Sequence, residues 1–248
     1  MNCVTCVKIG KKYSPIYVNK LYNAIRNQCD LDFICFTDDP SGINPNVIVY
    51  DIQPLVKNPS KWQTPVRERI GIRSWWPAWS KLELFAREEL DKYDKKIFFD
   101  LDVVIQGDLS PILDFETNLA LTHCTWKSEE WVKKNQGKRE AFAFNSDCIV
   151  WRDIKFIYEQ YVTNWKKYVR MYTGIDPYLN EYHLSDLELL PEVFYSYNKG
   201  SKPEHHYDGD GTPHHKFMPE YSVCTFHGKP DIHDLDDDHI LYKIWNDS

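Results

Sequence analysis

The most distinctive chemical feature of the sequence is a pair of aspartates, Asp100 and Asp102, placed directly after the apolar run 96–99. Such a run predicts a buried strand, and a second apolar run, 103–105, follows the pair. Residues i and i+2 of a strand share a face, so both carboxylates would project from the carboxyl edge, where open α/β sheets bind ligands. Two hard oxygen ligands there suit a divalent cation bound to a diphosphate. The alternative interpretation is a solvated pair in a turn, where Asp is common.

His227 is the second candidate ligand, because it lies near the end of a predicted strand from Val223 to His227 and precedes Gly228. A neutral imidazole would complete a carboxylate site and would favour Mn²⁺ over Mg²⁺. Gly228 allows the backbone to turn close to a ligand, and Lys229 would neutralise phosphate. Taken alone, a histidine before a glycine is a weak motif, and a structural role is the alternative.

The elements that must position these residues alternate between strands and helices. Ser14 and Pro15 suit the N-cap and the first position of a helix, and the apolar residues that follow have helical spacing. Strands are predicted before and after this helix, at 2–8, 32–37 and 47–50. This order favours a parallel sheet with crossover connections.

The rest of the chain continues in the same way. Ser80 and Glu83 resemble a capping box at a helix start, Asp153 is a predicted N-cap, and Asp176-Pro177 predicts another helix start. Further strands are predicted at 119–122, 141–144 and 148–151. No repeat, linker or shift in composition is visible, so we expect one domain over residues 1–248.

Composition excludes several classes of protein. With 37 acidic and 30 basic residues the net charge is −7, so we expect no nucleic-acid partner. No apolar run is long enough for a transmembrane segment, and no signal peptide is visible. The seven cysteines lie mostly in apolar runs, which predicts free buried thiols in the cytoplasm. The alternative, a redox or zinc half-site at Cys3 and Cys6, lacks a second CxxC.

Six stretches together resemble a metal-dependent glycosyltransferase of the GT-A fold, similar to the family-eight-like group. They occur in the same order as in that family and span nearly the whole chain. The resemblance implies an α/β fold with a mixed, mainly parallel, Rossmann-like sheet flanked by helices. It also implies a nucleotide-binding half at 1–102 and an acceptor half at 103–248 that ends in a metal ligand. The stretches are 7–14, 35–40, 79–85, 99–102, 142–146 and 226–230.

The resemblance also implies a role for each matching residue. Asp100, Asp102 and His227 would bind the metal, with Asp102 the surer ligand. Val7 and Gly10 would line the base pocket, and Asp38 would contact the nucleoside. Lys81 would approach either the loop of Asp100 and Asp102 or the diphosphate. Asn145 would face the sugar, and Asp176 would lie where the family often has an Asp-Gln pair. Here Pro177 replaces that Gln, so a side chain that the family uses near the anomeric carbon is missing.

The implied activity is transfer of a sugar from a nucleotide-diphosphate-sugar to a carbohydrate or other hydroxyl acceptor, with Mn²⁺ or Mg²⁺ and with retention of configuration. An inverting enzyme would need a carboxylate base, for which Asp176 and Asp147 are the candidates. Two other functions stay open. A phosphatase of the haloacid-dehalogenase type also has Asp-x-Asp after a strand, but its motif continues with small polar residues. A non-catalytic carbohydrate- or nucleotide-binding module would share the fold.

Three further features have no assigned role. The segment 205–215 is rich in His, Asp and Gly, and we interpret it as a loop over the acceptor, with a second metal site as the alternative. The acidic run 234–238 is interpreted as a solvated tail. Four tryptophans precede the predicted capping box and would either stack on the acceptor sugar or pack in the core: Trp62, Trp75, Trp76 and Trp79.

Overall fold

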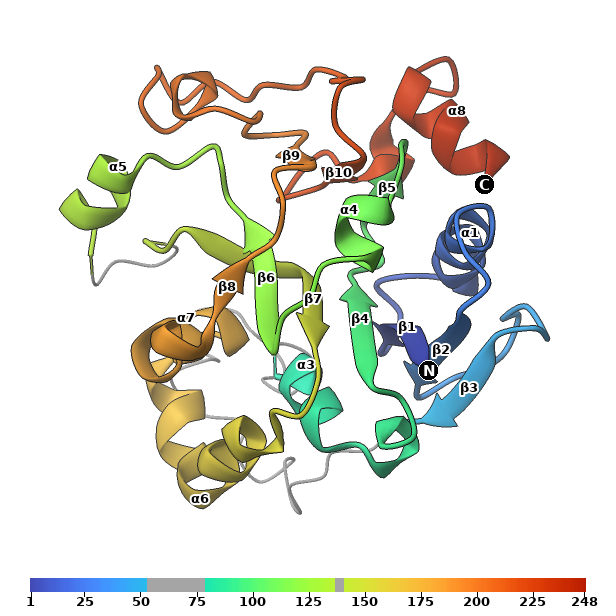
Figure 1. Cartoon of the computed structure of the whole chain (residues 1–248). Coiled ribbons are helices and arrows are strands. Elements are labelled where there is room, and N and C mark those ends of the chain that lie inside the picture. Colours follow the sequence, from blue (N-terminus) through green and yellow to red (C-terminus); the bar gives the residue numbers. More distant parts are fainter. Residues whose placement is uncertain (53–78, 137–140) are drawn as a thin grey trace.

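The computed structural model describes residues 1–52, 79–136 and 141–248, and in these ranges it contains two sheets flanked by helices (Figure 1). The larger sheet has seven strands in the order β3-β2-β1-β4-β7-β6-β8. Strands β3, β2, β1 and β4 are parallel, β7 is antiparallel to β4 and β6, and β8 is parallel to β6. The strand bounds are β1 Asn2–Lys8, β2 Asp32–Thr37, β3 Ile48–Asp51, β4 Lys95–Phe99, β6 Leu119–His123, β7 Phe144–Trp151 and β8 Glu188–Leu189.

The predicted mixed, mainly parallel sheet is therefore confirmed. Strands β1, β2 and β4 are apolar over most of their length because helices cover both faces of the sheet. Successive side chains of β1 enter different cores: Cys3 packs with one cluster, and Val4 packs with the other.

The smaller sheet brings together two segments that are far apart in the sequence. It has the order β5-β10-β9, with bounds β5 Val103–Ile105, β9 Phe194–Ser196 and β10 Val223–Thr225. Strand β5 follows the Asp100/Asp102 pair, and β10 precedes His227. Because β10 pairs antiparallel with β5, the turn after β4 and the segment after β10 lie at the same end of this sheet.

The helices form one layer on each side of the larger sheet. Helices α1 (Pro15–Arg26) and α8 (Ile240–Asp247) share a core with β5 and β10, and they lie side by side in Figure 1. On the other face, α3 (Ser80–Glu83), α6 (Lys155–Met171) and α7 (Ile175–Tyr182) share the second core. The shorter helices α4 (Ser110–Leu113) and α5 (Glu129–Lys134) lie in connections. No helix in the described ranges combines the length and apolarity that crossing a membrane requires.

Several predicted details were wrong. Ser80 is the first residue of α3 rather than its N-cap, and no side chain caps that helix, so the predicted capping box does not form. Residues 141–143 lie outside the strands because β7 is one strand that begins at Phe144. Ile154, not Asp153, is the N-cap of α6. The acidic run is followed by α8, which the sequence analysis did not predict.

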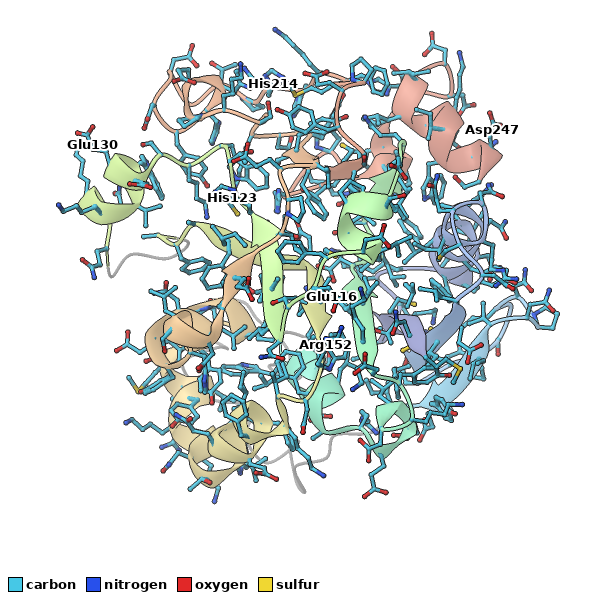
Figure 2. The ribbon with its side chains drawn as sticks, in the orientation of Figure 1. Glu116, His123, Glu130, Arg152, His214 and Asp247 are labelled. Carbon is cyan, nitrogen blue, oxygen red and sulfur yellow. The ribbon has the colours of Figure 1, made fainter. Side chains whose placement is uncertain are left out.

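At the lower edge of the larger sheet, ion pairs connect chain segments around Arg152. Arg152 follows β7 and pairs with Asp94 and Glu116, and Lys95 also pairs with Glu116. Figure 2 labels Arg152 and Glu116. This network lies at the amino end of β4, whereas Asp100 and Asp102 lie beyond its carboxyl end. The ion-pair network and the Asp100/Asp102 pair therefore lie at opposite ends of β4.

Candidate active site

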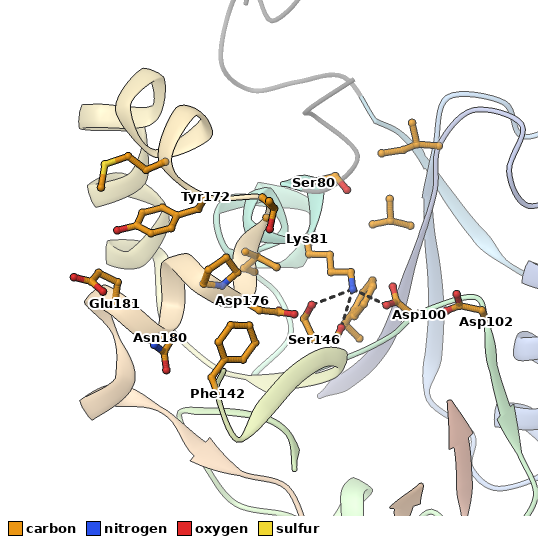
Figure 3. A pocket seen from close by; sticks show the side chains of 18 of the residues that line it. Ser80, Lys81, Asp100, Asp102, Phe142, Ser146, Tyr172, Asp176, Asn180 and Glu181 are labelled. Atoms are coloured by element: carbon orange, nitrogen blue, oxygen red, sulfur yellow. Dashed lines mark hydrogen bonds and ion pairs between the residues drawn. The ribbon is translucent and has the colours of Figure 1, made fainter. Parts of the chain in front are cut away.

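A cavity of about 1650 Å³ opens at the carboxyl ends of β1 and β4 (Figure 3). The ends of these two parallel strands supply Val7 and Asp100, and the turn after β4 supplies Asp102. Lys81 enters from α3 and Asp176 from the first turn of α7. The fold therefore gathers charged side chains from the turn after β4, from α3 and from α7 at one edge of the sheet, as expected for an open α/β sheet.

Lys81 and Asp100 form the central ion pair of this cavity. The Nζ of Lys81 lies 2.6 Å from Oδ2 of Asp100, and it donates to the carbonyl and hydroxyl oxygens of Ser146 at 2.9 and 3.1 Å (Figure 3). Burial, together with the charges of Asp102 and Asp147, raises the pKa of Asp100 to about 7 against the opposing charge of Lys81. Burial would lower the pKa of Lys81, but the surrounding carboxylates, Asp100 first, hold it above its usual range.

Asp102 is held by a residue that the sequence analysis gave no role. The hydroxyl of Tyr13 donates to Oδ2 of Asp102 at 2.5 Å, and Nζ of Lys12 lies 3.7 Å from the same oxygen. Burial raises the pKa of Asp102, the hydrogen bond from Tyr13 opposes this shift, and the charge of Asp147 adds to it. Tyr13 lies inside the stretch 7–14 that resembles the family, so its place in the sequence indicated a functional position. Its contact with Asp102 was not predictable from the sequence.

His227 contacts a carboxylate on β7. Its Nε2 lies 2.8 Å from Oδ2 of Asp147 and 2.9 Å from Nδ2 of Asn145, and its Nδ1 lies 2.8 Å from Oγ of Ser196. Burial raises the pKa of Asp147, but the charge and hydrogen bond of His227, with Lys81, hold it below its usual range. Asn145, predicted to face the sugar, is therefore engaged with the imidazole.

The chemistry of these side chains fits a divalent cation. Carboxylate oxygens and an imidazole nitrogen are ligands that Mn²⁺ accepts, and three carboxylates, Asp100, Asp102 and Asp147, lie near one largely buried ammonium. The ligand atoms of Asp100, Asp102 and His227 do not all lie within 4.8 Å of one another. The predicted set of three ligands thus stays a prediction.

Asp176, which the resemblance places near the donor sugar, lines the cavity. It lies in the first turn of α7, followed by Pro177. Its Oδ1 is buried without a hydrogen-bond partner in the described ranges. Burial raises the pKa of Asp176, and the charge of Lys81 opposes the shift. A carboxylate of this kind is available to a polar group in the cavity.

The other predicted binding residues divide into two groups. Val7 lines the cavity, whereas Gly10 and Asp38 contact each other: the Gly10 amide donates to both carboxylate oxygens at 3.0 and 3.1 Å. Asp38 therefore fixes the turn after β1, and it is not one of the residues that line the cavity. Lys229 is 68% exposed and pairs with Asp231 and Asp234 at 2.8 and 2.6 Å, so it too lies outside the lining.

The remaining motifs have structural roles where they are described. Trp79 is fully buried and stacks on Tyr161, so of the two alternatives it packs in the core. The other three tryptophans lie outside the described residues. In the loop 205–215, His205 stacks on His214. Within the described ranges only Asp231, His233 and Asp234 form a cluster of three or more possible metal ligands, so the loop contains none. All seven cysteines are free, as predicted.

Comparison with known proteins identifies the fold and the family. The model of glycosyl transferase family 8 matches residues 80–223. Among curated proteins, no sequence matches the chain. The crystal structure of the galactosyltransferase LgtC, solved with donor and acceptor sugar analogues, has a TM-score of 0.66 at 14% identity and covers 100% of this chain and 96% of its own.

Two further structures show the same fold. GlyE, a glycosyltransferase of Streptococcus pneumoniae TIGR4, has a TM-score of 0.59 at 12% identity and covers 100% of this chain and 60% of its own. Mouse xyloside xylosyltransferase 1 has a TM-score of 0.52 at 10% identity, with 93% and 98% covered. The chain belongs to glycosyl transferase family 8 and is a glycosyltransferase of the GT-A fold.

Proposed function

We propose that the enzyme transfers a sugar from a nucleotide-diphosphate-sugar to a hydroxyl acceptor, with Mn²⁺ or Mg²⁺ at Asp100, Asp102 and His227 and with retention of configuration. Family membership supports sugar transfer. The observation that carries the donor class is the gathering of Asp100, Asp102 and Lys81 at the carboxyl edge of the parallel strands, in the wall of one large cavity. That edge is where this sheet type binds nucleotides.

Under this proposal each side chain has a definite task. A bound divalent cation would supply Lewis acidity toward the departing nucleoside diphosphate. Lys81 holds Asp100 in place and contributes positive charge beside the diphosphate. Asp176 would accept a hydroxyl hydrogen bond from the donor sugar through its buried, unpartnered Oδ1. Residues 1–102 would then carry most contacts to the nucleotide, and residues 103–248 most contacts to the acceptor.

Retention of configuration is proposed from the family resemblance, and the contacts of the carboxylates agree with it. Inversion needs a carboxylate base free to reach the acceptor hydroxyl. One candidate, Asp147, lies against His227 and is not among the residues that line the cavity. The other, Asp176, lines the cavity, and we assign its unpartnered Oδ1 to a hydroxyl of the donor sugar rather than to the acceptor.

The test is nucleotide release from a panel of nucleotide-sugars, with and without Mn²⁺, followed by NMR assignment of the product anomer. We expect Mn²⁺-dependent release from one donor, and a decrease in kcat/KM of about 100-fold or more in Asp102→Ala. Asp108→Ala, which alters an exposed carboxylate in the segment after β5 that does not line the cavity, is the control and should retain activity. Full activity in the presence of a chelator contradicts the metal role, and an inverted product contradicts retention.

A further inference from the structure

Asp147 is a carboxylate of the candidate site for which the resemblance gives no role as a ligand. It lies on β7, which pairs antiparallel with β4 so that Cys148 faces Phe99. The amide of Asp100 donates a 2.8 Å hydrogen bond to the carbonyl of Asp147. The sheet itself therefore fixes the backbone of Asp147 beside the turn that carries Asp100 and Asp102.

The side chain of Asp147 points at the predicted metal-binding histidine. Its Oδ2 lies 2.8 Å from Nε2 of His227, and the two side chains are only 14% and 20% exposed. Ser196 Oγ contacts the opposite imidazole nitrogen at 2.8 Å and fixes the ring. Asn145 Oδ1 accepts a hydrogen bond from the backbone amide of Asp147 at 3.1 Å and so holds the backbone from which this carboxylate projects. Neighbouring side chains therefore hold both the imidazole of His227 and the backbone of Asp147 in place.

The spacing of these two groups is that of neighbouring ligands on one ion. An octahedral Mg²⁺ or Mn²⁺ has oxygen and nitrogen ligands at roughly 2.1 Å, which places adjacent ligands about 3 Å apart. The Nε2–Oδ2 distance of 2.8 Å is close to that value. Moreover, burial raises the pKa of both Asp100 and Asp102, the charge of Asp147 adds to both shifts, and the ammonium of Lys81 opposes both, so the three carboxylates act on one another electrostatically.

We propose that Asp147 is a further ligand of the divalent cation, adjacent to His227, and that the contact between them sets the spacing of the two ligands. This inference rests on the proposed function, because it concerns the same metal. It makes this cation site richer in carboxylate than the predicted set of Asp100, Asp102 and His227, and richer carboxylate sets favour hard divalent ions. A role in positioning His227 alone is the competing outcome of the test.

The experiment measures Mn²⁺ binding directly, by the EPR signal of free Mn²⁺ and by the relaxation of water protons on bound Mn²⁺. We expect Asp147→Ala to weaken binding by more than about 100-fold, beyond the loss typical of residues that only orient a ligand. We also expect the remaining bound Mn²⁺ to carry one more water. Asp147→Asn retains an oxygen and should lose less affinity. Thermal unfolding of each variant checks the fold.

Asp32→Asn is the matched control, because this carboxylate accepts from Tyr93 at the opposite end of the sheet and should not alter Mn²⁺ affinity. An unchanged number of bound waters in Asp147→Ala overturns the proposal, because Asp147 would then act only by positioning His227. If the wild type shows Mn²⁺-dependent transfer and Asp147→Ala binds Mn²⁺ as tightly, the proposed function stands and this inference fails. If the wild type binds no Mn²⁺, both fail.

Discussion

At the scale of single residues, Lys81 is the group on which the buried carboxylates depend. It contacts Asp100 at 2.6 Å, and its charge also opposes the rise that burial causes in the pKa of Asp176. Replacing it with Gln leaves these carboxylates without that ammonium and removes positive charge from the proposed diphosphate site. We expect kcat/KM to fall by about 100-fold or more in Lys81→Gln, measured with the donor identified in the panel.

The control for this prediction is Lys81→Arg, which preserves the charge but changes the geometry, because a guanidinium does not reproduce the contacts of a compact ammonium. It should retain more activity than the Gln variant. Near-wild-type activity in Lys81→Gln would remove Lys81 from the catalytic machinery, whereas equal losses in both variants would assign its effect to geometry alone.

Residues were predictable where their signal is local. Asp100 and Asp102 follow an apolar run, and a strand end at that position needs no knowledge of the rest of the chain. The contact of Asp147 with His227 depends instead on which strands pair, because β7 lies next to β4 and β10 next to β5. Nothing in the residues around Asp147 encodes those pairings, so sequence analysis considered this carboxylate only as a base.

At the scale of elements, α3, α6 and α7 are held together by aromatic rings. Trp79, the N-cap of α3, is fully buried and lies 5.0 Å from the ring of Tyr161 on α6 and 5.9 Å from that of Tyr178 on α7. Trp79→Ala would leave a large cavity between three helices. We expect a loss of about 3–5 kcal/mol in the free energy of unfolding, measured by denaturant titration.

Phe156→Ala provides the comparison, because Phe156 is an aromatic residue of α6 that is 49% exposed. Its replacement should change stability by no more than about 0.5 kcal/mol. If Trp79→Ala has the free energy of unfolding of the wild type but a higher KM for the acceptor, Trp79 would be a ligand-stacking residue and its assignment to the core would be wrong.

Elements with a strong period were predicted well, and weakly marked ones were not. Strand β1, helix α1 and strand β2 have continuous apolar runs or a helical stripe, and the structure places them as expected. The predicted start of α3 was wrong because Ser80 and Glu83 have capping-box spacing, yet Glu83 pairs instead with the buried Arg87. Short strands such as β8 and β9 have too few residues to show a period.

At the scale of the whole molecule, the small sheet brings together the two chain segments that carry Asp102 and His227. Strand β5 continues from Asp102, β10 leads to His227, and α1 and α8 pack on the same core as both strands. The sequence separation between Asp102 and His227 exceeds one hundred residues, so only the folded chain brings these segments together. We therefore expect metal affinity to be lost when the protein unfolds, rather than to persist in a local peptide.

The pH dependence of stability is also a property of the whole molecule, because groups with opposite shifts act together. His183 is 2% exposed, and burial lowers its pKa against the opposing charge of Asp186. The unfolded chain therefore binds this proton first as the pH falls below about 6.5. The stability that neutral His183 provides is present above that pH and is lost as the pH falls toward the lower folded-state pKa. Asp176, whose pKa burial raises, contributes with the opposite sign.

The contribution of His183 is isolated by comparing how steeply the free energy of unfolding changes with pH in the variant and in the wild type. We expect the free energy of unfolding to decrease less steeply between pH 7 and pH 5 in His183→Gln than in the wild type, in chelator, because the variant has no imidazole to protonate on unfolding. His233→Gln, at an imidazole that is 47% exposed, should leave the slope closer to that of the wild type. Parallel slopes for His183→Gln and wild type would show that the buried imidazole accepts its proton in the folded protein as readily as in the unfolded chain.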